Sequence, residues 1–64
     1  MRIDRVKLVS ELTRQNMTQK QLAEKAGISR TTVNYIKAGK NCCEEVGNKI
    51  ATALQVPIES LLEN

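Results

Sequence analysis

The most informative part of the chain is residues 18–40, which read TQKQLAEKAGISRTTVNYIKAGK. Thr18 and Gln21 have the spacing of a capping box, in which each side chain accepts a hydrogen bond from the other residue's backbone amide at a helix start. Gly27 suits the end of that helix, because glycine adopts the left-handed backbone conformation at little cost. Ser29 is a favourable N-cap for a further helix. The segment therefore predicts two short helices joined by a turn of three residues.

A turn this short makes the two helices cross steeply and closely. Ala23 supplies the small residue that a close crossing needs. The second helix, over about residues 29–38 and ended by Gly39, has few apolar residues, so packing alone does not explain it. The apolar residues expected to hold the crossing together are Leu22, Ile28, Val33 and Ile36. This pattern predicts a helix-turn-helix and favours DNA recognition over the alternative, a plain helical hairpin inside a bundle.

The rest of the chain also has helical spacing. A first helix, over about residues 4–15, is predicted from an apolar stripe made of Ile3, Val6, Leu8, Val9 and Leu12. A fourth helix is expected over about residues 44–54 and a short fifth one after Pro57, a good first helical residue. No segment alternates as a strand does. We expect one all-α domain over residues 1–64, a compact five-helix bundle.

Composition excludes several classes of function. With 64 residues, the chain is too short for a nucleotide-binding α/β fold. It has no histidine, the residue that most often acts as a general acid or base. No nucleophile stands beside a base, so we expect neither an enzyme nor a cofactor. The single aromatic residue is a tyrosine, which argues against single-strand binders that stack bases on aromatic platforms. No apolar run reaches the roughly 18 residues of a membrane span, and we expect a cytoplasmic protein.

Charge is distributed unevenly along the chain. Residues 1–43 carry nine Lys and Arg against three acidic residues, a net charge of +6. Residues 44–64 carry one Lys against four Glu, a net charge of −3, and the two parts add to the overall +3. A basic front and an acidic back suggest a polyanionic partner on one side. The alternative is an ordinary solvated surface.

The chain has two cysteines, Cys42 and Cys43, which are adjacent. Adjacent cysteines rarely pair with each other, because the ring that they close is strained. They are too few for a structural zinc site, and we expect no metal. We interpret them as free thiols in a reducing compartment, with redox sensing or intermolecular crosslinking as the alternatives.

Residues 18–40, quoted above, resemble the lambda-repressor-like, Cro/C1-type (XRE) helix-turn-helix domains. Residues 50–62, IATALQVPIESLL, are similar to the last two helices of that family. The resemblance implies a five-helix bundle that binds double-stranded DNA sequence-specifically, usually as a homodimer on a two-fold symmetric operator. It also implies transcriptional regulation, most often repression, by a protein that a bacterium, a phage or a mobile element encodes.

The resemblance also implies roles for individual residues. The recognition helix enters the major groove with its N-terminus first. The residues that it implies at base edges are Arg30, Thr31, Asn34 and Tyr35. The residues that it implies at phosphates are Thr18, Gln19, Ser29, Lys40 and Asn41.

The chain departs from the family pattern in three places. Lys37-Ala38-Gly39 replaces the usual Glu-Asn-Gly after the recognition helix, so the Asn contact to a phosphate is expected to be missing. Gln55 replaces the usual Gly after the fourth helix, which costs up to about 1 kcal/mol if that site is left-handed. Cys42-Cys43 is unusual in the DNA-facing loop.

Two other classes of function compete with a DNA-binding regulator. A helix-turn-helix can serve as a protein-interaction module of the antitoxin or anti-repressor type, with DNA binding secondary. Tighter binding of a protein by the acidic rear than of duplex by the basic front would identify that class. An enzyme has no support in the sequence. Met1 and the complete fifth helix expected after Pro57 favour an intact small protein over the DNA-binding part of a longer repressor.

Overall fold

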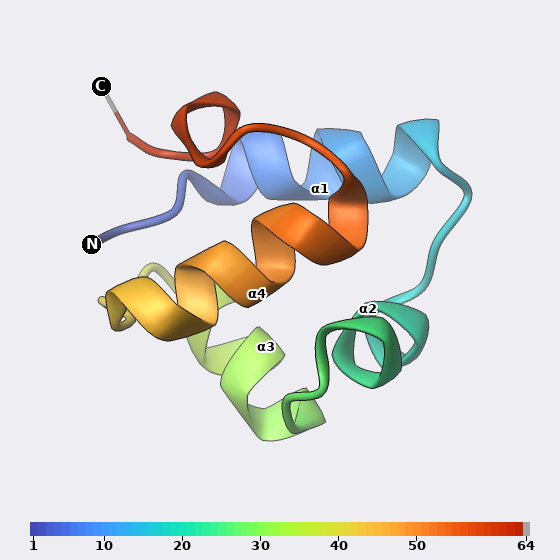
Figure 1. Cartoon of the computed structure of the whole chain (residues 1–64), viewed down its shortest axis with the longest axis horizontal. Coiled ribbons are helices and arrows are strands. Elements are labelled where there is room, and N and C mark those ends of the chain that lie inside the picture. The colour runs from blue at the N-terminus through green and yellow to red at the C-terminus, as the bar shows by residue number, and fades with distance from the viewer. Residues whose placement is uncertain (64) are drawn as a thin grey trace.

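The computed structural model describes residues 1–63 and contains four α-helices (Figure 1). They are α1 (Arg5–Arg14), α2 (Gln19–Ala26), α3 (Arg30–Lys37) and α4 (Glu44–Leu54), and a 3₁₀ turn over Ile58–Ser60 follows them. α4 packs against α2 and against the 3₁₀ turn, and α3 packs against both α1 and α2. No helix within residues 1–63 is long and apolar enough to cross a membrane.

The expected fifth helix is wrong, because the segment after Pro57 makes only a 3₁₀ turn of three residues. The backbone beyond that turn pairs with the start of the chain instead of continuing a helix. The Asp4 N–H donates to the Leu61 carbonyl over 2.7 Å, and Ile3 and Leu62 form a single antiparallel bridge. The two ends of the described chain therefore lie side by side (Figure 1).

One apolar core joins all four helices to the two ends of the chain. Its largest fully buried side chains come from every helix and from the segments that flank them: Ile3, Leu8, Leu22, Val33, Ile36, Ile50, Leu54 and Leu61. Ala23 is also buried, with 3% of its surface exposed, which fits its predicted place at the crossing of α2 with α3. The core thus holds the helix-turn-helix against α4.

The predicted stripe of the first helix is wrong at two positions. Val6 and Val9 are 67% and 40% exposed, whereas Leu8 and Leu12 are buried. An α-helix has 3.6 residues per turn, so a strict spacing of three drifts around the helix, while Leu8 and Leu12 share one face. Ile3 lies before α1 and reaches the core from the segment that pairs with Leu62.

Local signals fix the helix ends as the sequence predicts. Thr18 and Gln21 form both hydrogen bonds of a capping box. Gly27, which ends α2, has the left-handed φ of 72°. The Ser29 hydroxyl accepts the Thr32 N–H at the start of α3. Gly39 is left-handed as well, with a φ of 88°, so the helix-turn-helix begins and ends where glycine and N-cap chemistry place it.

Candidate nucleic-acid interface

α3 presents most of its surface outward. Of its eight residues only Val33 and Ile36 are buried. All four residues predicted to reach base edges are exposed on this helix: Arg30, Thr31, Asn34 and Tyr35. Arg30 is the first residue after the Ser29 N-cap, so its side chain starts at the end of α3 that would enter a groove first.

The predicted phosphate ligands occupy the starts of α2 and α3 and the loop after α3. Thr18, Ser29, Lys40 and Asn41 are exposed, and Gln19 is half-buried. The structure brings Asn41 together with Thr31 and Tyr35 around one concavity, and it places the remaining predicted residues on other parts of the helix-turn-helix.

Thr18, the N-cap of α2, already forms hydrogen bonds within the protein. The Thr18 N–H donates to the Gln21 side chain over 2.8 Å, and the Thr18 hydroxyl accepts the Gln21 N–H over 3.1 Å. These bonds leave the next amides, those of Gln19 and Lys20, without a partner among residues 1–63. Free amides at a helix start are anion-binding groups, so the backbone of α2 offers a phosphate more than the Thr18 side chain does.

Cations without acidic partners concentrate in the helix-turn-helix. Several basic residues elsewhere are already engaged: Arg2 pairs with Glu63, Arg14 with Glu11, and Lys49 with Glu45. Within the described residues the cations that have no acidic partner and no hydrogen bond are Arg5, Lys20, Lys25, Arg30, Lys37 and Lys40. Three of these cations were not among the predicted contact residues, although they belong to the basic excess of residues 1–43: Lys20, Lys25 and Lys37.

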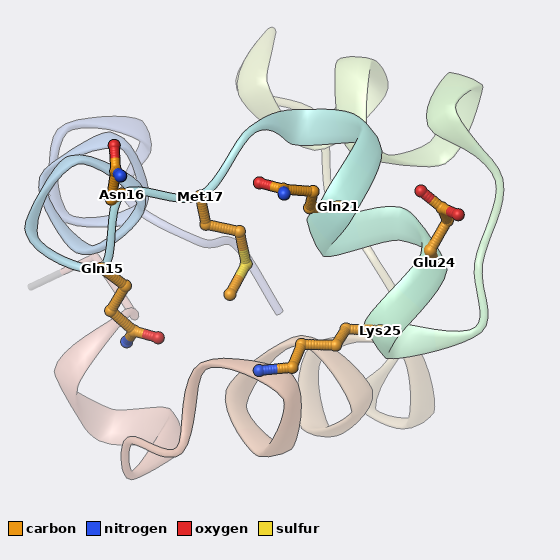
Figure 2. Close-up of a pocket in the computed structure, with 6 residues that line it drawn as sticks. All are labelled: Gln15, Asn16, Met17, Gln21, Glu24 and Lys25. Atoms are coloured by element: carbon orange, nitrogen blue, oxygen red, sulfur yellow. The ribbon is translucent and has the colours of Figure 1, made fainter.

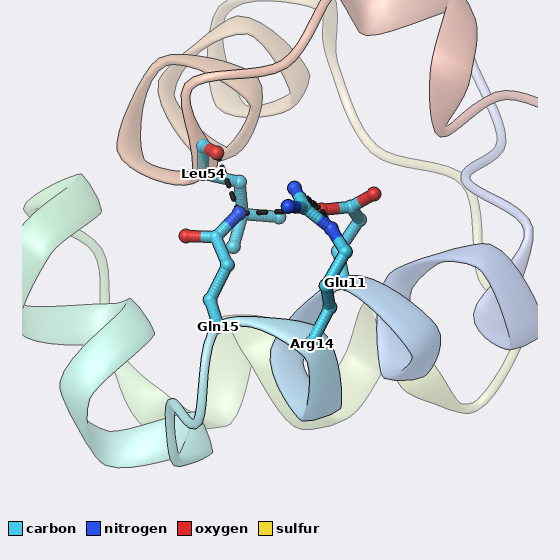
Figure 3. A network of polar contacts seen from close by, with 4 residues as sticks. All are labelled: Glu11, Arg14, Gln15 and Leu54. Carbon is cyan, nitrogen blue, oxygen red and sulfur yellow. Dashed lines mark hydrogen bonds and ion pairs between the residues drawn. The ribbon is translucent and has the colours of Figure 1, made fainter.

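A network of hydrogen bonds lies at the C-terminal end of α1 (Figure 3). The Arg14 guanidinium donates to the Glu11 carboxylate, and this hydrogen bond lowers the pKa of Glu11. The Gln15 amide donates to Glu11 over 3.2 Å and to the Leu54 carbonyl over 2.7 Å. The Glu11 carboxylate therefore balances the charge of Arg14. As a result, α1 contributes less positive charge to the surface than its composition suggests.

A concavity of about 500 Å³ lies beside the connection from α1 to α2 (Figure 2). Its lining side chains are Gln15, Asn16, Met17, Gln21, Glu24 and Lys25. They include one carboxylate and one ammonium group but no cysteine and no histidine. This concavity therefore offers neither a nucleophile nor a set of metal ligands, and we assign it no ligand.

A smaller concavity of about 310 Å³ lies between α3 and the start of α4. Thr31 and Tyr35 line one wall, and Cys42 and Cys43 line the other. Both cysteines are free thiols; Cys42 is half-buried and Cys43 is exposed. Burial raises the pKa of the Cys42 thiol. No local feature of the sequence predicts that the cysteines lie next to Thr31 and Tyr35 of α3.

Solved structures with the same fold include parts of larger chains. The chain is 25% identical to PhpD with cadmium, with a TM-score of 0.85. It is 25% identical to a mutant hydroxyethylphosphonate dioxygenase, with a TM-score of 0.88. All of this chain is covered in both matches, but it spans only 14% of the length of those proteins. No curated protein matches the chain.

A family comparison covers most of the chain. The model of a family described as "Helix-turn-helix" matches residues 9–61. That range contains α2, the turn and α3 together with α4 and the 3₁₀ turn. The chain belongs to the helix-turn-helix family of the Cro/C1 (XRE) type.

Proposed function

We propose that the protein is a sequence-specific regulator of transcription that binds double-stranded DNA, acting as a repressor. The observation that carries this proposal is the outward face of α3. That helix buries two of its eight residues and exposes Arg30, Thr31, Asn34 and Tyr35. An α-helix fits the major groove, where each base pair has a distinct pattern of donors and acceptors.

Each residue has a role in this proposal that fits its chemistry. Arg30 donates two hydrogen bonds to the O6 and N7 of a guanine, and Thr31 contacts a base through its methyl or hydroxyl group. Asn34 and Tyr35 lie about one turn further along the helix and reach bases or phosphates. The residues that hold phosphates are Thr18, Gln19, Ser29, Lys40 and Asn41, and phosphate contacts fix the orientation of the protein without reading sequence.

A homodimer on a two-fold symmetric operator completes the proposal. One recognition helix reads only a few base pairs, so affinity and specificity require two half-sites about 34 Å apart. The contact between the copies involves the segment 57–62 or the loop 42–45. We place the protein in the cytoplasm of a bacterium, where its own genome, a phage or a mobile element encodes it.

Selection of bound duplexes from a random pool tests the proposal. It predicts an enriched sequence with two-fold symmetry and half-sites one helical turn apart. Enrichment of an asymmetric site that one chain occupies would contradict the dimer, and enrichment of no sequence would contradict sequence-specific binding.

A protein-interaction module of the antitoxin or anti-repressor type is the second candidate. The exposed pair Val6 and Val9 on α1 favours it, because this apolar surface has no place in the DNA complex proposed above. This candidate predicts that Val6→Ser leaves duplex affinity unchanged but weakens binding of a protein partner, and loss of duplex affinity in that variant would contradict it.

A further inference from the structure

We propose that Cys42 and Cys43 form a binding site for monovalent copper that lies against the recognition helix. The coupling of this site to DNA rests on the proposed function, whereas the site itself does not. Both cysteines line the concavity of about 310 Å³ between α3 and α4. They are adjacent free thiols, so the site is a pair of soft ligands on one short segment.

Two backbone contacts with Met1 hold Cys42 in place, and Cys43 is held at the start of α4. The Cys42 N–H donates to the Met1 carbonyl over 2.8 Å, and the Met1 amino group donates to the Cys42 carbonyl over 2.9 Å. Cys43 is the N-cap of α4, with a φ of −77° and a ψ of 161°. Its side chain makes no capping hydrogen bond, so its sulfur atom is free to bind a ligand.

The number of ligands selects the kind of ion. The chain has no histidine, and residues 1–63 contain no group of three or more His, Cys, Asp and Glu side chains placed to hold a metal. Structural zinc takes four ligands, which this segment does not offer. Thiolates prefer soft metal ions, and Cu(I) is a soft ion with a single positive charge. Two thiolate ligands are enough to coordinate one such ion.

Binding changes the charge beside the recognition helix. One Cu(I) forms two copper–sulfur bonds, both thiols release their protons to solvent, and copper keeps its oxidation state. The ion and the two thiolates together carry one negative charge, where the thiols carried none. That charge lies in the concavity whose other wall contains Thr31 and Tyr35. It opposes the approach of DNA phosphates, so copper releases the proposed regulator from its operator.

A competition titration with bathocuproine disulfonate, under anaerobic and reducing conditions, tests the site. We expect one Cu(I) per chain without a change in oligomeric state. Cys42→Ser and Cys43→Ser each weaken Cu(I) binding at least about tenfold, because each removes one of two soft ligands. Serine is a good N-cap, so Cys43→Ser keeps α4 intact. Glu44→Gln is the matched control and leaves Cu(I) binding unchanged.

Three results would overturn the site: one Cu(I) shared by two chains, dependence on only one of the two cysteines, or no competition with the chelator. A second titration tests the coupling, using a duplex selected by the copper-free protein. One equivalent of Cu(I) weakens duplex binding about tenfold per half-site in 0.1 M salt, the effect of one opposed phosphate contact. Equal affinity with and without Cu(I) would overturn the coupling. A copper-free chain that binds no duplex would overturn the proposed function and the coupling, while the chelator titration still decides the site.

Discussion

The side-chain amide of Gln15 donates a hydrogen bond to the backbone carbonyl of Leu54 over 2.7 Å (Figure 3). Leu54 is the last residue of α4, and the carbonyls at a helix end have no partner within the helix. Gln15 follows the last residue of α1. This one bond therefore joins the C-terminal ends of two helices that the sequence separates by the whole helix-turn-helix.

Gln15→Ala removes this bond together with the longer one to the Glu11 carboxylate, and it leaves the Leu54 carbonyl without its protein partner. We expect the free energy of unfolding to fall by about 0.5–1.5 kcal/mol, the usual contribution of a hydrogen bond, with most of the loss from the bond to Leu54, because the Glu11 carboxylate keeps its bond to Arg14. Urea denaturation measures it. Gln21→Ala is a useful comparison, since it removes a side-chain bond of the capping box at an exposed site. An unchanged urea midpoint for Gln15→Ala would contradict a structural role for this bond.

Gln55, which stands where the family usually has glycine, has a left-handed backbone with a φ of 57°, so the condition for a steric cost is met. Gln55→Gly relieves the steric cost of a β-carbon there, and we expect up to about 1 kcal/mol of added stability. Asn16 is the matched control, because it is also left-handed, with a φ of 54°, but asparagine tolerates that conformation better. A smaller gain for Asn16→Gly is expected, and a loss of stability in Gln55→Gly would refute the argument.

Ala23 lies buried on α2, which packs against α3. Ala23→Leu inserts extra volume at the crossing that holds the helix-turn-helix together, and we expect a loss of about 1–3 kcal/mol. Ala26→Leu enlarges a half-buried residue of the same helix and is expected to cost less. Thermal or chemical denaturation of both variants checks the prediction. Equal midpoints for Ala23→Leu and the wild type would mean that the helices do not cross closely at Ala23.

Glu11 couples stability to pH through its hydrogen bond with Arg14. That bond lowers the pKa of Glu11 below its ordinary value of 4.5. A carboxyl whose pKa is lower in the folded state stabilises the fold above its unfolded pKa, and this contribution disappears as the pH falls through the folded pKa. Arg14→Gln should therefore raise the pKa of Glu11 toward 4.5. An NMR titration of the Glu11 carboxyl measures this shift, and an unchanged pKa would show that Arg14 is not its cause.

The helix-turn-helix was predictable because its signals act over three or four residues. The pair Thr18 and Gln21 and the single residues Gly27 and Ser29 each set a helix end by their own chemistry, and the structure has each of them in the predicted role. The exposure of Arg30 followed in the same way, because α3 has too few apolar residues to be buried on several sides.

Contacts between distant residues were not predictable in this way. Nothing in the residues near Met1 indicates its pairing with Cys42, and nothing near Ile3 indicates its bridge to Leu62. That bridge uses the backbone of the last segment, where a fifth helix was expected. The wrong prediction for Val6 has a different cause. Apolar spacing alone did not identify the face of α1 that contains Leu8 and Leu12 as the buried one. The concavity beside Cys43 has walls from α3 and from residues 41–46, and only the folded chain brings these two segments together.

Lys40 is exposed in the loop after α3 and has no acidic partner among residues 1–63. As a phosphate ligand it contributes affinity for every duplex. Lys40→Ala should therefore weaken all duplexes by about the same factor and reduce the slope of log K against log salt by about one unit per half-site. Binding isotherms over a range of salt concentrations, for the selected duplex and an unrelated one, measure both effects. A loss confined to the selected duplex would show that Lys40 contacts a base.

The most direct test of the proposal that α3 reads DNA sequence is a ratio of affinities for Arg30→Ala. The two duplexes are the selected site and the same site changed at the one guanine that Arg30 is proposed to contact, both at one salt concentration. The wild type should prefer the selected site, and Arg30→Ala should lose about 1–3 kcal/mol per half-site of that preference. If Arg30→Ala instead weakens both duplexes by the same factor, Arg30 is a phosphate ligand, and its proposed role in sequence recognition is wrong.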